Sequence, residues 1–243
     1  YAAFEREVTS DVDAVICNRV SNVFGFIQPV GRIAQLCKER GVPLIVDASQ
    51  SAGMLSVDME NWGAAFIAMP GHKGLYGPQG TGLLLCGGQV QPLLYGGTGS
   101  LSAQQEMPDF LPDRLEAGTH NVCGAAGLLE GMKFVARTGA GRIHRHERAL
   151  AGRMMDALER CSGVTVFRGG DSQSGLCSMI VDGLDCEEAG EMLAKRGIAV
   201  RSGLHCAPLA HRTAGTVETG TIRFSFSAFN HPDQVDQAAA AVR

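Results

Sequence analysis

Short apolar runs alternate with amphipathic segments along most of the chain. Residues 14–17 and 43–46 form two apolar runs, and the segment between them opens at Pro29 and stops at Gly41. Within that segment the apolar residues recur at helical spacing, which predicts a helix between two short buried strands. A strand, a helix and a second strand in this order are typical of a parallel sheet with crossover helices. The pattern therefore predicts an α/β fold.

The same alternation continues to the end of the chain and predicts the remaining elements. Further strands are expected at residues 64–68, 81–86, 165–167, 176–181, 198–201 and 221–227. Further helices are expected at residues 122–137, 142–161, 186–196 and 232–242. Residues 87–121 form a long connection rich in Gly and Pro, for which we expect a function.

The Gly-rich stretch at residues 138–141 separates two predicted helices and suggests a domain boundary. We therefore expect a large domain over residues 1–138, built on a mostly parallel sheet. A smaller C-terminal α/β domain is expected over residues 139–243.

Composition narrows the class of protein. Hydrophobic residues make up 45% of the 243 residues and charged residues 19%, which excludes a disordered chain. The net charge is -4 and Lys and Arg are scattered, so we expect no nucleic-acid partner. No apolar run approaches the roughly 18 residues of a membrane span, so we expect no membrane location.

The cysteines and the first residues of the chain bear on its cellular context. The 8 cysteines include no CxxC pair, and several lie in apolar runs. This pattern is typical of reduced, buried thiols and favours a cytoplasmic location. The first residues lack the charged and apolar regions of a signal peptide. Because the chain begins at Tyr1 rather than Met, we expect that sequence upstream of Tyr1 is missing.

Two residues in the first half suit the chemistry of pyridoxal phosphate (PLP). PLP needs a lysine amine for a Schiff base and a carboxylate that keeps its pyridine nitrogen protonated. Lys73 follows a predicted strand in a loop whose glycines allow close approach of a ligand. Asp47 ends another predicted strand, where ligands of open α/β sheets collect. A lone Asp there more often caps a helix, and a lone Lys is usually a surface charge, but the pair favours PLP.

Cys206 is the candidate nucleophile. Most free cysteines are inert core residues, but Cys206 lies in a glycine-kinked turn. His205 is adjacent and Arg201 is near in sequence, and such neighbours favour the thiolate. A zinc site formed by His205, Cys206 and His211 lacks a complete set of ligands at a familiar spacing, so we expect no metal.

Four short motifs stand in the order found in one enzyme family. They are Val-Asp-Ala-Ser-Gln at 46–50, Gly-His-Lys at 71–73, Glu-Ala-Gly-Thr at 116–119 and Arg-Ser-Gly-Leu-His-Cys at 201–206. This order resembles the cysteine desulfurases, which are PLP enzymes of fold type I in the class V aminotransferase family. The last motif is similar to that of group II, which includes selenocysteine lyase-like proteins. The likeness covers nearly the whole chain, but the N-terminal segment of the family has no counterpart before Tyr1.

The resemblance implies a role for each residue that matches the family. Lys73 would form the Schiff base with PLP, and Asp47 would pair with the pyridine nitrogen. The remaining cofactor contacts would come from Asn22 and Gln50 at the phenolic oxygen, His72 at the phosphate and Thr119 at the phosphate of a neighbouring subunit. The contact from Thr119 implies a homodimer with shared active sites.

The substrate site implied by the resemblance contains Arg223 and Arg201. A planar guanidinium can bind a carboxylate through two hydrogen bonds, which suits Arg223 for the substrate carboxylate. From the residues alone, an exposed strand position is an equally good interpretation of Arg223. Lys73, Cys206 and His205 would be the catalytic residues.

The activity implied is the release of sulfur from L-cysteine. Lys73 would move the Cα proton, and Cys206 would take the sulfur as a persulfide while L-alanine forms. A sulfur-acceptor protein would then receive the sulfur, for sulfur metabolism such as iron-sulfur cluster assembly. A selenocysteine lyase, a class V aminotransferase and a catalytically inactive truncated form remain open as alternatives.

Overall fold

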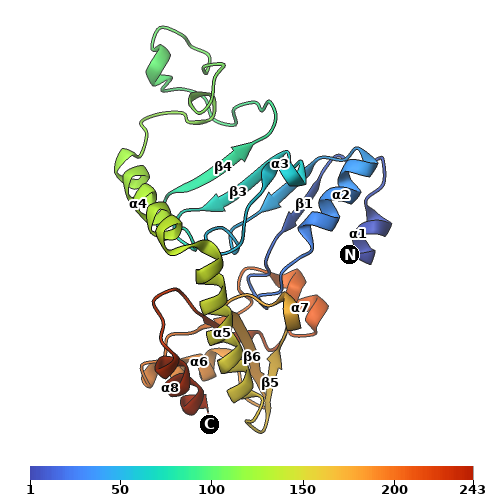
Figure 1. Ribbon diagram of the computed structural model, residues 1–243, viewed down its shortest axis with the longest axis vertical. Coiled ribbons are helices and arrows are strands. Elements are labelled where there is room, and N and C mark those ends of the chain that lie inside the picture. The colour runs from blue at the N-terminus through green and yellow to red at the C-terminus, as the bar shows by residue number, and fades with distance from the viewer. Residues whose placement is uncertain (243) are drawn as a thin grey trace.

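The computed structural model describes residues 1–242 and contains two four-stranded sheets (Figure 1). The first sheet has the order β1-β2-β3-β4. Its strands are β1 (Val15–Asn18), β2 (Leu44–Asp47), β3 (Phe66–Pro70) and β4 (Gly82–Cys86). β1, β2 and β3 are parallel, whereas β4 runs antiparallel to β3. The predicted α/β class with a mostly parallel sheet is confirmed.

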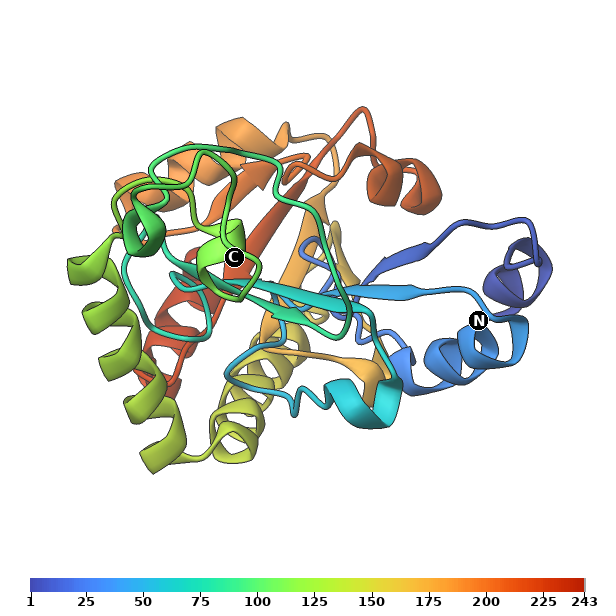
Figure 2. The ribbon, with the colours of Figure 1, turned by 90° about the horizontal axis from the view of Figure 1, so that it is seen from above.

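Helices cover one face of the first sheet. These helices are α2 (Val30–Arg40) and α3 (Met59–Trp62), and α1 (Ala2–Glu7) lies beside them at the start of the chain. Figure 2 shows α2 and α3 on the same side of the strands. Side chains such as Ile33, Val46 and Ile67 have no exposed surface and form the core between helices and sheet. As the sequence predicts, α2 ends at Gly41, which takes the left-handed conformation that glycine allows.

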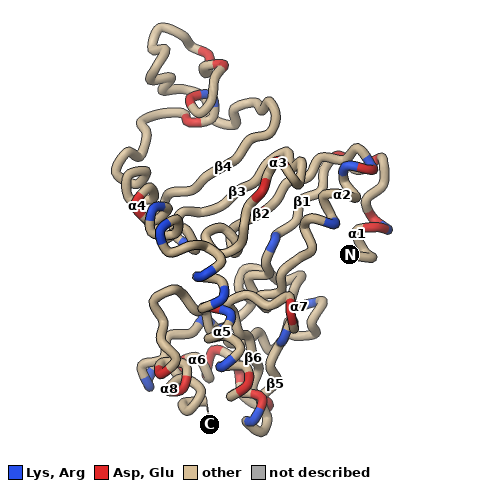
Figure 3. Tube along the Cα trace, viewed as in Figure 1, with Lys and Arg blue, Asp and Glu red and all other residues tan. Residues whose placement is uncertain are grey.

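The opposite face of the first sheet is open. Burial alternates along β1 and β2, so every second residue points away from the helices. Ile16 is 72% exposed and Leu84 50% exposed on that face. Asp47 is the one charged residue of the described strands β1 to β4, and the tube in Figure 3 is mostly tan over this sheet. Asp47 therefore lies at the carboxyl end of β2, beside the exposed Asn18 of β1, on a face that is otherwise mostly apolar.

A projecting segment and two long helices connect the sheets. Residues 87–121 extend beyond β4 and contain two short 3-10 helices, at Gly99–Leu101 and Asp113–Leu115 (Figure 1). The long helices are α4 (Val122–Thr138) and α5 (Ala140–Leu158), with Gly139 between them. α5 packs against the second sheet.

The second sheet is antiparallel and has the order β5-β6-β8-β7. Its strands are β5 (Val164–Phe167), β6 (Leu176–Val181), β7 (Arg201–Gly203) and β8 (Thr221–Ser225). The helices packed with it are α5, α6 (Cys186–Lys195) and α8 (Pro232–Val242). A 3-10 turn lies at Gly170–Ser172, and α7 (Pro208–Ala214) follows β7. Met154, Met155 and Leu158 of α5 anchor the core of this part.

The structure differs from the predicted elements mainly around short segments. The helices α1, α3 and α7 have 6, 4 and 7 residues, too short for a clear helical period. β7 lies at Arg201–Gly203 rather than at 198–201. The reason is that the Ile198 N–H donates to the Leu193 carbonyl, so the chain first closes the end of α6. The residues that pair with β8 come only after this closure.

Truncation of a side chain should reduce the stability of the protein by different amounts on the two faces of the first sheet. Ile67→Ala on β3 should lower the free energy of unfolding by about 2–5 kcal/mol, because it empties a fully buried position. The control Ile16→Ala, on the open face, should change it by no more than about 0.5 kcal/mol. Urea unfolding of both variants measures the difference. Equal losses would contradict the assignment of the two faces.

Candidate functional site

The loop that carries Lys73 is held tightly against the turn that follows Asp47. The Gly71 N–H donates to the Thr81 carbonyl at 2.7 Å, which closes the base of the loop. A Cβ placed on Gly53 would collide with the carbonyl group of Gly74. The two segments therefore touch through their backbones, which only glycine permits here. This contact places Lys73 beside the carboxyl end of β2.

The charge of the Asp47 carboxylate acts on the Lys73 amine. Asp47 Oδ1 accepts a hydrogen bond of 2.8 Å from the Ser49 N–H, which fixes the carboxylate at the end of β2. Burial lowers the pKa of Lys73, while Asp47 opposes that shift and Arg223 and Arg201 add to it. The influence of one charge on another falls with the distance between them. Asp47, Arg201 and Arg223, three further residues that the sequence singled out, are thus the charges that act on the Lys73 amine.

Two guanidinium groups face this site from the second sheet. Arg201 and Arg223 are direct partners in the pairing of β7 with β8. Arg223 Nη1 donates to the Asn22 carbonyl at 2.5 Å, and Arg223 Nε donates to Ser225 Oγ at 3.2 Å. Burial lowers the pKa of Arg223, and Arg201 lowers it further. Within residues 1–242, neither arginine forms a salt bridge, so the pair can accept an anionic ligand.

The thiol of Cys206 is exposed beside Arg201. Arg201 Nη2 lies 3.4 Å from Cys206 Sγ. His205 and Cys206 both have positive φ values, 51° and 61°, a conformation that costs energy for residues other than glycine. The strained turn directs the thiol outward just before α7 begins.

The ring of His205 is turned away from solvent and toward β8. Its exposed fraction is 3%. His205 Nε2 lies 2.9 Å from Thr221 Oγ1 and 3.1 Å from the Thr221 carbonyl. The His205 carbonyl accepts a hydrogen bond of 2.6 Å from Asn22 Nδ2. Burial lowers the pKa of His205 to about 4, helped by the charge of Arg223, so the ring is neutral at neutral pH.

Three further residues from the motifs lie at different distances from this group. His72 directly precedes Lys73, and Gln50 lies in the turn that follows Asp47. Thr119, by contrast, lies at the base of the projecting segment, where it lines a glycine-rich hollow with Gly97 and Gly118. Within residues 1–242, Lys73 is not among the residues that line this hollow.

Thr221 and Ser225 are partners that the sequence did not single out. They flank Arg223 on β8 and share its face of the strand, because side chains alternate along a strand. Thr221 holds the ring of His205, and Ser225 holds Arg223 Nε. The signal in the sequence that could have found them is the alternation of Thr221, Arg223 and Ser225 along β8.

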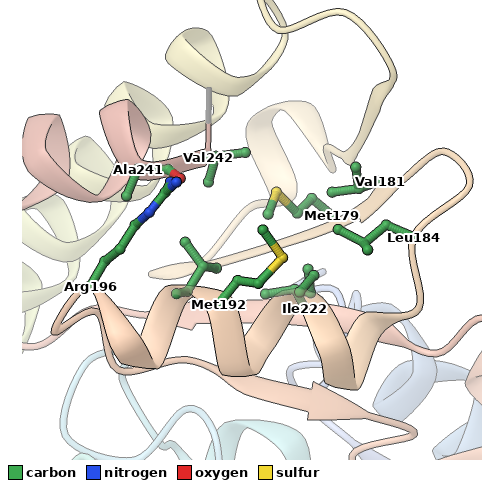
Figure 4. Close-up of a pocket in the computed structure, with 10 residues that line it drawn as sticks. Met179, Val181, Leu184, Met192, Arg196, Ile222, Ala241 and Val242 are labelled. Atoms are coloured by element: carbon green, nitrogen blue, oxygen red, sulfur yellow. The ribbon is translucent and has the colours of Figure 1, made fainter.

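Other features of the chain lie apart from this site. Figure 4 shows an apolar cavity of about 150 Å³ between α6 and α8, into which Met192 and Ile222 point. Ile222 neighbours Arg223 but faces the other side of β8. Residues 1–242 contain no cluster of three His, Cys, Asp or Glu that could hold a metal ion. None of the helices in that range is both long and apolar enough to cross a membrane.

Two relatives of this chain by sequence are named probable cysteine desulfurases. A probable cysteine desulfurase of Methanothermobacter thermautotrophicus is 34% identical over 242 residues, which cover 95% of this chain and 60% of the relative. A probable cysteine desulfurase of Xylella fastidiosa is 30% identical over 241 residues, which cover 97% of this chain and 57% of the relative. The chain thus spans less than two thirds of the length of these relatives.

Two solved structures that match this chain are also cysteine desulfurases. An apo cysteine desulfurase from Thermococcus onnurineus matches 98% of this chain, and 61% of its own chain, with a TM-score of 0.89 and 32% identity. The cysteine desulfurase CsdA from Escherichia coli matches 99% of this chain, and 61% of its own, with a TM-score of 0.87 and 29% identity. The family model described as aminotransferase class-V matches residues 1–238. The chain therefore belongs to the class V aminotransferase family.

Proposed function

We propose that this chain carries the chemistry of a PLP-dependent cysteine desulfurase, which transfers sulfur from L-cysteine to Cys206 and releases L-alanine. The observation that carries the proposal is the meeting of Lys73, Asp47 and Arg223 with the exposed thiol of Cys206. The names of the relatives support the same activity. A lysine, a carboxylate, an anion site and a nucleophile are the four parts that this reaction needs.

The cofactor site is proposed on the first sheet, in a domain of residues 1–138. The donor set fits PLP, because Lys73 has a lowered pKa and Asp47 offers a fixed carboxylate nearby. Lys73 would hold the cofactor covalently and Asp47 would face the pyridine nitrogen. Further contacts are proposed for Asn22 and Gln50 at the phenolic oxygen, His72 at the phosphate and Thr119 at the phosphate in a second subunit. The contact from Thr119 makes a homodimer part of the proposal.

The substrate site is proposed between the two sheets, with residues 139–243 as the smaller domain. Arg223, assisted by Arg201, binds the carboxylate of L-cysteine through its guanidinium. When PLP is bound, it supplies an electron sink for the charge that develops at the substrate Cα. Because its pKa is lowered, the Lys73 amine is suited to moving the Cα proton.

Cys206 performs the transfer of sulfur. Its thiolate attacks the substrate sulfur, so that a new S–S bond forms while the Cβ–S bond breaks. The electron pair of the broken bond stays with the carbon fragment, which gains a proton and leaves as L-alanine. The enzyme keeps the sulfur as a persulfide, and no external oxidant is required. The sulfur then passes to an acceptor protein. We propose that this acceptor serves iron-sulfur cluster assembly and that the transfer takes place in the cytoplasm.

His205 supports this step by fixing the turn rather than by touching Cys206 with its ring. The ring bonds to Thr221, and the backbone carbonyl bonds to Asn22. Both contacts anchor the strained turn that presents the thiol. We therefore propose a positioning role for His205 in place of direct proton transfer.

Borohydride trapping tests the cofactor proposal. The chain should develop a visible absorbance band with added PLP, and borohydride reduction should leave a permanent adduct on the peptide that contains Lys73. Lys73→Ala should abolish the adduct, whereas Lys133→Ala, on the exposed surface of α4, should keep it. Peptide mass mapping locates the adduct. An adduct spread over surface lysines in wild type would overturn the assignment.

Removal of the thiol tests the nucleophile. In PLP-loaded protein given L-cysteine, Cys206→Ala should lose the persulfide and lower the rate of alanine formation by about a hundredfold or more. Cys123→Ala, at an exposed position on α4, should behave like wild type. Cyanolysis measures the persulfide, and chromatography measures alanine. Full sulfide release by Cys206→Ala would refute the role of the thiol, and a 2-oxo acid product would indicate an aminotransferase.

The environment of His205 predicts how its ring titrates. Its folded-state pKa of about 4 lies below the usual value of 6.5, so the unfolded chain binds more protons between these two values. The stability contributed by the neutral ring should therefore be complete above pH 6.5 and be lost as the pH falls toward 4. NMR titration of the imidazole measures the pKa, and His205→Gln should flatten the fall in stability. A ring that titrates near 6.5 would contradict the burial described above.

A further inference from the structure

Tyr76 links the turn that holds Lys73 to the rest of the molecule. The Tyr76 N–H donates to the Lys73 carbonyl at 2.9 Å and closes that turn. Tyr76 has a φ of 54°, which is costly for a bulky residue. Its ring packs edge-on against Phe134 of α4 at 5.0 Å and against Phe229 at 5.5 Å. The surrounding contacts thus hold Tyr76 in a conformation that its own backbone disfavours.

Three segments of the chain meet at the Tyr76 hydroxyl. It accepts a hydrogen bond of 3.0 Å from the Ala228 N–H, in the turn after β8. It also donates to Glu147 Oε1 on α5 at 3.3 Å. Because β8 carries Arg223, the hydroxyl joins the turn of Lys73 to the strand that holds the proposed substrate arginine.

Glu147 is a buried carboxyl group that the proposed reaction does not use. Its exposed fraction is 4%, and its Oε2 has no hydrogen-bond partner within residues 1–242. Gly175 leaves it little space, since a Cβ there would lie 2.6 Å from the Glu147 Cβ. Leaving a carboxyl oxygen buried and unpaired costs stability. The bond with Tyr76 is the one hydrogen bond of the Glu147 side chain within the described residues.

We propose that Tyr76 and Glu147 form a positioning pair, which sets the separation between Lys73 and Arg223. This inference rests on the proposed function, because it assigns the pair to the same site. The two residues to be aligned come from different sheets, and a misplacement of about 1 Å between reacting groups can cost about a hundredfold in rate. A hydroxyl bonded to both α5 and the turn after β8 is suited to fix that distance.

The protonation of Glu147 gives the pair a measurable signature. Burial raises the pKa of Glu147 to about 7, and the hydrogen bond from Tyr76 limits the rise. Tyr76 is the titratable group that faces the carboxyl from another element, while His144, His146 and Arg148 flank it on α5 itself. Since the folded-state pKa lies above the ordinary value of 4.5, the stability contributed by Glu147 should fall as the pH rises from 4.5 through 7.

Thermal unfolding between pH 4.5 and 8 tests the contact without any turnover. Because His205 acts in the opposite direction below pH 6.5, the test compares variants: the Tm of Glu147→Gln minus that of wild type should rise with pH, as wild type loses the contribution of Glu147. Tyr76→Phe should move the loss to higher pH, because the hydroxyl that stabilises the carboxylate is gone. The control Glu191→Gln, at an exposed position on α6, should follow wild type. Identical curves for wild type, Tyr76→Phe and Glu147→Gln would overturn the pair.

Steady-state kinetics of the PLP-loaded protein with L-cysteine tests the positioning role. Tyr76→Phe and Glu147→Gln should each lower kcat/KM about tenfold, mainly through a higher KM, because Arg223 moves relative to Lys73. The visible band of bound PLP should also change its dependence on pH in both variants and not in Glu191→Gln. Unchanged KM and unchanged absorbance would refute the positioning role even if the Tm curves differ. A wild-type protein that binds PLP on Lys73 but does not turn over L-cysteine would count against the proposed function alone, and the absorbance would still test the pair.

Discussion

The backbone contact between Gly53 and Gly74 is the constraint on which the site depends. β2 and β3 are parallel neighbours, so Asp47 and the loop of Lys73 emerge at the same edge of the sheet. The common edge alone would leave the loop free to point elsewhere. The two glycines let the turn after Asp47 and the loop of Lys73 touch directly, since a Cβ on either would overlap backbone atoms. The placement of Lys73 is therefore built into the main chain.

The electrostatics of the site follow from this packing together with the second sheet. Burial disfavours the charged form of Lys73, and two nearby arginines disfavour it further. Those arginines are adjacent in the register of β7 and β8 and have no acidic partner in a salt bridge within residues 1–242. One arrangement thus prepares an amine that loses its proton more easily and a cationic site for a carboxylate. Neither sheet could provide both features by itself.

The sequence was informative where function depends on local pattern. The apolar run of β2 ends at Asp47 as predicted, whereas β3 lies at Phe66–Pro70 rather than at 64–68. The places of Asp47 at a strand end and of Lys73 in the loop after a strand could still be predicted. The loop and the cysteine turn could be predicted from glycines and from the resemblance to a family. Contacts that depend on strand register or on packing between the sheets could not be predicted. The bond of His205 to Thr221 and the meeting of Tyr76 with Glu147 belong to this second kind, since 16 and 71 residues separate the partners.

The alternation of side chains divides the first sheet between the hydrophobic core and the proposed cofactor site. On the covered face, Val46 and Ile67 are fully buried against helices, and a change there acts on folding. On the open face, Asp47 is the one charge among the described strands β1 to β4, and it lies beside the exposed Asn18 of β1. Neighbouring residues of β2 thus serve opposite purposes, because Val46 and Asp47 point to opposite sides. A shift of one residue in the register of β2 would bury the carboxylate in the core and expose the valine, so the hydrophobic core that folds the sheet also keeps Asp47 in the site.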